Sequence, residues 1–133
     1  MNTETRGNEM NKEQVLDIVK DIIANATKTG ADYMLRLNGG TNNCYTANYW
    51  VTRMLNNEGI YTDWVKCTYT GDVPHAVALV EGSIVVDVAN IDVLGARTWA
   101  LADYIAEVGM ANAVPYDVKT AEKIVHKEHL NII

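Results

Sequence analysis

The sequence predicts an α+β fold in which helices pack on a short antiparallel sheet. Two segments with helical spacing of apolar residues come first, three segments rich in β-branched residues follow, and two further helical segments come last. The expected elements are helices at 11–30 and 44–59, strands at 60–69, 75–80 and 83–89, and helices at 98–108 and 118–129. Because the strands are grouped and do not alternate with helices, an antiparallel sheet is favoured over a doubly wound α/β sheet.

Length and composition indicate one globular domain. The chain has 133 residues, of which 48% are hydrophobic and 21% are charged, and this is enough apolar material for a core. We expect the domain to span residues 11–133 and the polar residues 1–10 to form a disordered tail. The net charge of −6 disfavours a nucleic acid or an anionic membrane as the partner.

The sequence also bears on where the protein resides. It has no apolar run long enough to cross a bilayer, and its N-terminal residues lack the apolar core of a signal peptide. We therefore expect a cytoplasmic protein in which Cys44 and Cys67 are reduced thiols. A disulfide between these two cysteines stays open on the sequence alone.

The first helix has recognisable signals at both ends. Asn11 is a good N-cap residue, Gln14 three residues later completes a variant of the capping box, and Gly30 ends the segment. Its apolar stripe consists of Val15, Leu16, Val19, Ile22, Ile23 and Ala26. The short apolar segment 33–37 that follows fits either a helical turn or an edge strand.

The second helix begins with a cysteine. Thr41, Asn42 and Asn43 are all good N-cap residues, so the start of the helix is marked, although more than one residue could be the cap. Cys44 should then lie near unpaired backbone N–H groups at the positive end of the helix dipole, and both favour thiolate over thiol. Gly59 fits the position just after the helix. Five residues at helical spacing should face the protein interior: Cys44, Ala47, Val51, Met54 and Leu55.

The predicted hairpin can bring a histidine and an aspartate together. A two-residue loop would place His75 and Asp87 on opposite faces of the sheet. A three-residue loop at 80–82, with Gly82 in the left-handed conformation, pairs His75 directly with Asp87. Directly opposed residues have Cβ atoms ~5 Å apart, so we expect an imidazole–carboxylate hydrogen bond. The other face of the hairpin is wholly apolar, and its residues are Ala76, Ala78, Val80, Ile84, Val86 and Val88.

The other polar and aromatic residues favour structural roles. Cys67 alternates with Val65 and Tyr69 along one strand face, which indicates a core position. His126 and His129 are three residues apart and could chelate a metal, but a solvated helix face is the favoured interpretation. We therefore expect no metal and no cofactor. The helix at 98–108 should bury Trp99, Ala102, Ile105 and Ala106, and Pro115 should separate it from the last helix.

Cys44, His75 and Asp87 are the residue types that serve as nucleophile, base and orienting acid in a catalytic triad. In such a set the thiolate attacks a carbonyl carbon, the imidazole moves the proton, and the carboxylate fixes the imidazole tautomer and stabilises its cation. The backbone N–H of Cys44 is the first expected donor to the oxyanion. Three asparagines are candidates for a side-chain oxyanion donor: Asn38, Asn42 and Asn43.

Four short motifs surround these residues in a characteristic order. They read NCY at 43–45, NEGI at 57–60, PHAVALV at 74–80 and IVVD at 84–87. In this order they resemble the transglutaminase-like branch of the papain-like cysteine proteases, in particular the bacterial transglutaminase-like cysteine proteinases. The resemblance covers roughly residues 42–95. Tyr45 and Val88 depart from the family pattern, which commonly has an acidic residue after the cysteine and an asparagine after the aspartate.

This resemblance implies a papain/transglutaminase-like fold and a catalytic triad of Cys44, His75 and Asp87. The implied activity is acyl transfer from an amide or peptide bond of a protein or peptide substrate, through a thioester at Cys44. Hydrolysis, deamidation of glutamine and transamidation share this chemistry as far as the thioester, and the sequence does not separate them. Asp92 is the alternative triad acid, and Asn90 is considered if Asp87 faces away. The alternative function is a catalytically silent copy of the fold that binds a protein partner.

Overall fold

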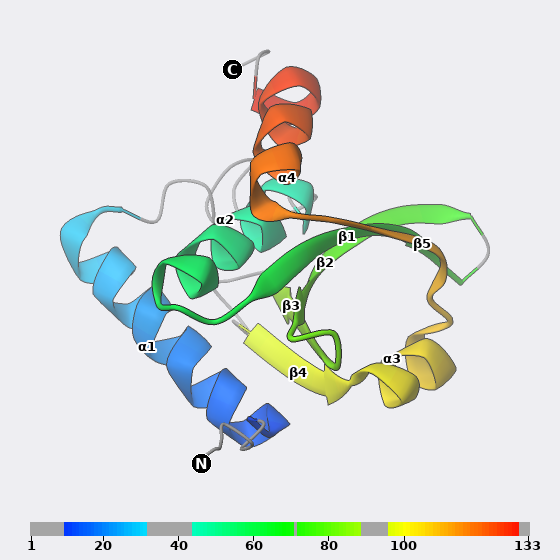
Figure 1. Ribbon diagram of the computed structural model, residues 1–133, viewed down its shortest axis with the longest axis horizontal. Coiled ribbons are helices and arrows are strands. Elements are labelled where there is room, and N and C mark those ends of the chain that lie inside the picture. The colour runs from blue at the N-terminus through cyan, green and yellow to red at the C-terminus, as the bar shows by residue number, and fades with distance from the viewer. Residues whose placement is uncertain (1–9, 32–43, 71, 89–95, 131–133) are drawn as a thin grey trace.

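The computed structural model describes residues 10–31, 44–70, 72–88 and 96–130 (Figure 1). These residues form an α+β structure built around a five-stranded antiparallel sheet with strand order β4-β3-β2-β1-β5. The strands are β1 (Thr62–Tyr69), β2 (Val73–Val80), β3 (Ile84–Val88), β4 (Ala96–Ala100) and β5 (Ala111–Tyr116). The helices are α1 (Lys12–Thr29), α2 (Cys44–Asn57), α3 (Leu101–Val108) and α4 (Val118–Val125), and a π-helical turn, η4 (His126–Leu130), continues α4.

Helix α1 has the ends that the sequence predicts. The Asn11 side chain accepts a hydrogen bond from the Gln14 backbone N–H at 2.9 Å, and the Gln14 side chain accepts one from the Asn11 backbone N–H at 2.9 Å. Gly30 ends the helix in the left-handed conformation, with φ of 75°. Val15 and Val19 on the predicted stripe are at most 1% exposed, so this stripe attaches α1 to the core.

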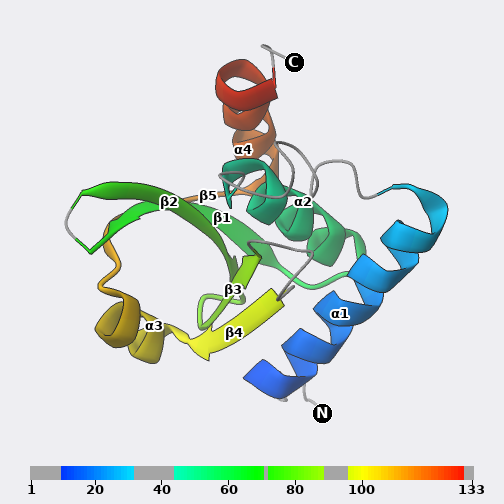
Figure 2. The same ribbon diagram turned by 180° about the vertical axis from the view of Figure 1, so that it is seen from behind.

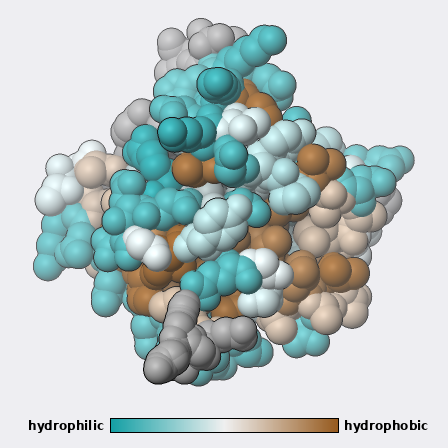
Figure 3. Space-filling view, viewed as in Figure 1, coloured by the Kyte–Doolittle hydropathy of each residue, from teal (hydrophilic) through white to brown (hydrophobic). Residues whose placement is uncertain are grey.

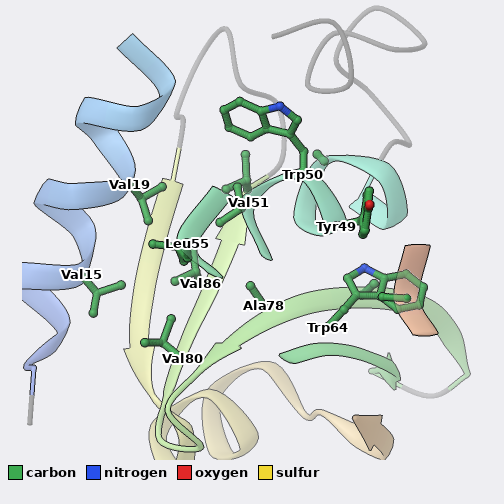
Figure 4. Close-up of a cluster of buried hydrophobic side chains, with 14 of the residues drawn as sticks. Val15, Val19, Tyr49, Trp50, Val51, Leu55, Trp64, Ala78, Val80 and Val86 are labelled. Carbon is green, nitrogen blue, oxygen red and sulfur yellow. The ribbon is translucent and has the colours of Figure 1, made fainter. Parts of the chain in front are cut away.

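The two faces of the sheet are covered by different helices. Helices α1 and α2 lie on one side of the sheet, and α3 lies on the other (Figures 1 and 2). The apolar hairpin face predicted from the sequence packs under α1 and α2, and all six of its residues are at most 6% exposed. Figure 4 shows this core, in which residues from α1, α2, β1, β2 and β3 meet. The prediction of a wholly apolar face is therefore confirmed.

Helix α2 is buried on nearly all sides. Ala47, Val51 and Leu55 are at most 1% exposed, as their spacing predicts. Thr52, which is not on the predicted face, is also fully buried, and its hydroxyl donates to the Asn48 carbonyl at 2.7 Å. Since α2 packs against the sheet, α1 and α4, it is the central helix of the structure.

The C-terminal third differs from the prediction. Residues 96–100, which include the start of the helix expected at 98–108, form strand β4, where Trp99 pairs with Val85 of β3. Pairing of this segment satisfies backbone groups that an exposed β3 edge would leave open, and this outweighs the helical spacing. Helix α3 buries only Tyr104 completely, and Ile105, expected to be buried, is 45% exposed.

Strand β5 is an element that the sequence reading missed. Pro115 was expected only to separate two helices, but it lies within β5 opposite Val65 of β1. Proline is tolerated there because β5 is an edge strand, where a missing N–H interrupts no second ladder. The last predicted helix is also shorter, because regular α4 ends at Val125 and the π-helical turn follows.

The apolar segment expected at 33–37 and residues 1–9 of the tail expected at 1–10 fall outside the described residues. Met10, the last residue of the expected tail, packs against the core. Among the residues that are described, no helix has both the length and the apolarity that crossing a bilayer requires. Cytoplasmic localisation stays a prediction from the sequence.

Replacing Gly59 tests the end of α2. Gly59 has φ of 82°, its N–H donates to Asn56, and the Ile60 N–H donates to Leu55, each at 3.0 Å. A Cβ atom added at Gly59 would meet no atom within 4 Å. Gly59→Ala should therefore lose about 1 kcal/mol of unfolding free energy from backbone strain alone, and Gly59→Asn should lose less. Urea unfolding measures both, and equal stability of the three proteins would contradict this account of the helix end.

Candidate active site

The hairpin between β2 and β3 has a three-residue loop, but not the one expected. Val80 lies opposite Ile84, so the loop consists of residues 81–83 and begins one residue later than the predicted 80–82. Glu81 and Gly82 both have positive φ, 51° and 74°. The predicted loop length is therefore right, but the predicted strand register, which paired Leu79 with Ser83, is wrong.

This register brings His75 and Asp87 together diagonally. Continuing the observed pairing places Asp87 opposite Val77, not opposite His75 as predicted. The two side chains still share a face, because either three-residue loop keeps the strand alternation in phase. Nε2 of His75 lies 2.8 Å from Oδ2 of Asp87, so the predicted hydrogen bond is confirmed even though the predicted pairing is not.

The carboxylate of Asp87 has hydrogen-bond partners from three elements. His75 of β2 and the Tyr104 hydroxyl of α3 both donate to Oδ2, at 2.8 and 3.0 Å. Nδ2 of Asn48 in α2 donates to Oδ1 at 3.3 Å. Tyr104 is 1% exposed and His75 is 9% exposed. The acid is thus held in a defined orientation and is largely shielded from water, with 17% of its side chain exposed.

Cys44 lies beside the same imidazole, at the start of α2. Burial of the ring lowers the pKa of His75, but hydrogen bonds and charge from Asp87 and Cys44 outweigh burial and raise this pKa from 6.5 to about 9. Since Asp87 occupies Nε2, Nδ1 is the nitrogen left for the thiol. The structure therefore brings together all three residues predicted for the site, and the raised pKa of His75 favours the protonated imidazole at neutral pH.

Cys67 is the second thiol of this region. It pairs with His75 across β1 and β2 and is 6% exposed, which confirms its predicted core position. Burial, followed by charge interactions with Asp87 and Cys44, raises the pKa of Cys67 to about 11. Both cysteines are free, so the disulfide that the sequence left open is not formed.

Two residues of the site were missed by sequence reasoning. Asn48 is completely buried in α2, and Tyr104 is the only fully buried residue that α3 contributes. An asparagine between Ala47 and Tyr49, inside an otherwise buried helical segment, is a signal that could have been used. Tyr104 had no comparable signal, because its partner is 17 residues away on another element.

Several other candidates cannot be placed. The oxyanion candidates Asn38, Asn42 and Asn43, and the alternatives Asn90 and Asp92, fall on residues outside the described ranges. His126 is exposed at the end of α4, and the side chain of His129 is not among those described. Within the described ranges, no three or more His, Cys, Asp or Glu side chains gather where they could hold a metal ion.

An apolar cavity of about 160 Å³ lies on the α3 face of the sheet. Its walls include Val77 and Val85, which follow His75 and precede Asp87 on the same strand faces, and Ile105 of α3. Figure 3 shows apolar residues at the surface over α3. Helix α3 therefore covers this face of the sheet without filling the space beneath it.

Comparisons of this chain with family models, with curated proteins and with solved structures find no match. The interpretation of the site therefore depends on its geometry and chemistry.

The raised pKa of His75 predicts how stability changes with pH. A histidine whose pKa is higher in the folded than in the unfolded state contributes stability in full below about pH 6.5, and this contribution is lost as the pH rises through about 9. The free energy of unfolding should therefore fall over this range. In His75→Gln the fall should be smaller, whereas the exposed control His126→Gln should behave like wild type. Urea unfolding at a series of pH values measures the effect, and identical pH profiles for all three proteins would contradict it.

Proposed function

We propose that this protein has a papain/transglutaminase-like fold and is a cysteine-dependent acyl-transfer enzyme acting on an amide or peptide bond. One observation carries the proposal: an imidazole bonded to a partly buried carboxylate through Nε2 and contacted by a thiol at the first residue of a helix. These groups come from residues 44, 75 and 87, so folding and not local sequence has assembled them. The order of the motifs in the sequence supports the same class.

In the proposed first step, the Cys44 thiolate attacks the carbonyl carbon of the substrate. A carbon–sulfur bond forms, and the π electrons of the carbonyl move to its oxygen. The His75 imidazolium then gives its proton to the leaving nitrogen as the carbon–nitrogen bond breaks, which leaves a thioester at Cys44. The raised pKa of His75 supports this role, because a protonated imidazole is available at neutral pH.

In the proposed second step, water or an amine attacks the thioester. Neutral His75 accepts the proton of the nucleophile, the carbon–sulfur bond breaks, and the Cys44 thiolate is regenerated. Water gives hydrolysis or, on a glutamine side chain, deamidation, whereas an amine gives transamidation. The backbone N–H of Cys44 has no partner within its own helix and would donate to the oxyanion. The second donor is proposed to be Asn38, Asn42 or Asn43.

Thiol labelling tests whether Cys44 is the activated nucleophile. Iodoacetamide at pH 7 should label Cys44 of the native protein first, as expected for a partly exposed thiol beside an imidazole. Cys67 should stay unlabelled because it is buried and its pKa is raised to about 11. Peptide mass spectrometry after a short pulse distinguishes the two sites.

The matched variants are His75→Gln, which should slow labelling of Cys44 at neutral pH, and the exposed control His126→Gln, which should not. Equal labelling of both cysteines in the native protein would count against an activated Cys44.

Removal of the nucleophile separates the enzyme from a silent binding module. Cys44→Ala removes one partly exposed sulfur atom and should change stability by about 1 kcal/mol, while turnover should fall by at least ~10³-fold. Cys67→Ala is the matched control, because it removes the neighbouring buried thiol and should keep turnover. The assay offers casein for peptidase activity, a glutamine peptide for deamidation and the same peptide with dansylcadaverine for transamidation.

Intact mass spectrometry should detect the acyl adduct on wild type and on Cys67→Ala but not on Cys44→Ala. If folded Cys44→Ala retains the full biological effect of the protein, the binding module replaces the enzyme.

A further inference from the structure

We propose that Asn48 is a positioning residue, whose side-chain amide sets the Cys44 turn of α2 against the strands that carry His75 and Asp87. This inference deepens the proposed function and rests on it. Asn48 lies four residues after Cys44 on α2 and is completely buried, and it would not contact a substrate. Its role would be to hold the nucleophile and the imidazole–carboxylate pair in register.

The first argument is where the β2–β3 ladder ends. The strands pair from Val80 and Ile84 as far as Ala78 and Val86, and continuing this register would place Ala76 opposite Val88. The described strands show no direct pairing at that point.

The Asn48 amide fills this position of the ladder. Nδ2 donates to the Ala76 carbonyl at 2.9 Å, and Oδ1 accepts from the Val88 N–H at 2.8 Å. The side chain of a helix therefore replaces one rung of the sheet. Because Ala76 adjoins His75 and Val88 adjoins Asp87, this rung sets the separation of the two strands beside the site.

The second argument is the connection to the nucleophile. Nδ2 of Asn48 also lies 3.1 Å from the carbonyl oxygen of Cys44, and 3.3 Å from Oδ1 of Asp87. The group has only two hydrogens, so the shortest contacts, to Ala76 and Cys44, are direct, and the contact to Asp87 is shared. One amide thus joins the backbone of the nucleophile, the strand of the imidazole and the acid.

The third argument is the chemistry that this position demands. A carboxylate could accept from Val88 but could not donate to Ala76 or Cys44, and an apolar side chain could do neither. Since the site is buried, each group left without a partner destabilises the arrangement. Asparagine is short, neutral and both donor and acceptor, which is the combination that the ladder gap requires.

The same helix provides a matched control. Asn56 donates to the Thr52 carbonyl and to the Thr62 carbonyl, both at 2.8 Å, and accepts from the Thr62 N–H at 3.3 Å. Asn48 and Asn56 therefore share three bonds of the same kind: one to the carbonyl four residues earlier and two to strand backbone. Only Asn48 makes them next to the site. Asn48 makes two longer contacts in addition, to Oδ1 of Asp87 at 3.3 Å and to the Val88 carbonyl at 3.4 Å.

The experiment compares Asn48→Ala with Asn56→Ala. Both should lower the urea midpoint, because each removes a bond within α2 and two bonds to strand backbone. Only Asn48→Ala should slow iodoacetamide labelling of Cys44 at pH 7, by about 10-fold or more, and lower kcat on the order of 10²-fold with a smaller change in KM. If both variants behave alike in labelling and kcat, Asn48 has only a structural role and the proposal fails.

A second readout is the titration of His75 followed by NMR. Five groups face this imidazole from the elements packed around it: Cys44 from α2, Cys67 and Tyr69 from β1, Asp87 from β3, and Tyr104, through Asp87, from α3. Displacement of Cys44 and Asp87 should move the titration of His75 toward its usual value in Asn48→Ala and leave it unchanged in Asn56→Ala. An unchanged titration in both variants would overturn the proposal.

A third variant covers failure of Asn48→Ala to fold. Asn48→Asp keeps the volume and the acceptor for Val88 but loses the donors to Ala76 and Cys44, so labelling of Cys44 should still be slow. Wild-type labelling in Asn48→Asp would overturn the proposal.

These outcomes also separate this inference from the proposed function. Slow labelling in Asn48→Ala with no turnover by wild type on any substrate would support the positioning role and reject the enzyme. If wild type turns over a substrate and Asn48→Ala does so equally well, the enzyme is supported and the positioning role is rejected.

Discussion

The carboxylate of Asp87 is the point at which the two sides of the sheet are joined. Its side chain belongs to the face that α3 covers, yet its oxygens are reached by Tyr104 from α3 and by Asn48 from α2 on the other side. This is possible because β2 and β3 stop pairing before Asp87 is reached. The same opening allows the first residue of α2 to contact His75. If β2 and β3 were paired along their full length, α2 would lie on one face of the sheet and the His75–Asp87 pair on the other.

The sequence predicts correctly which residues lie on each face of the β2–β3 hairpin, but it does not predict the register in which the two strands pair. Successive side chains of a strand point to opposite faces of the sheet, which assigns each residue of 76–80 and 84–88 to one face. Any three-residue loop between the strands leaves that assignment unchanged. The exact loop depends on turn conformation, and Glu81 adopts a positive φ that side-chain preferences alone do not favour. Cys44, His75 and Asp87 could therefore be grouped from the sequence, while the diagonal contact between His75 and Asp87 could not.

The elements that were missed are the ones whose structure depends on distant partners. β4 and β5 are edge strands, and each is held in extended structure by pairing with one neighbouring strand, β3 or β1. Segment 98–108 has helical spacing, but backbone pairing with β3 determines the conformation of its first residues. Asn48 makes one local bond, to the Cys44 carbonyl, but its bonds to β2 and β3 span 28 to 40 residues.

The weak attachment of α3 has a consequence for the dynamics of the protein. This helix has eight residues, buries one side chain completely and lies over a cavity, so it is a candidate for opening at much lower free energy than the α1–α2 side. Each opening would withdraw the Tyr104 hydroxyl from Asp87 and admit water to that oxygen. Amide hydrogen exchange in α3 would then report the same fluctuation that changes the hydration of the acid. Local unfolding of α3 and the hydration of the Asp87 carboxylate would then change together.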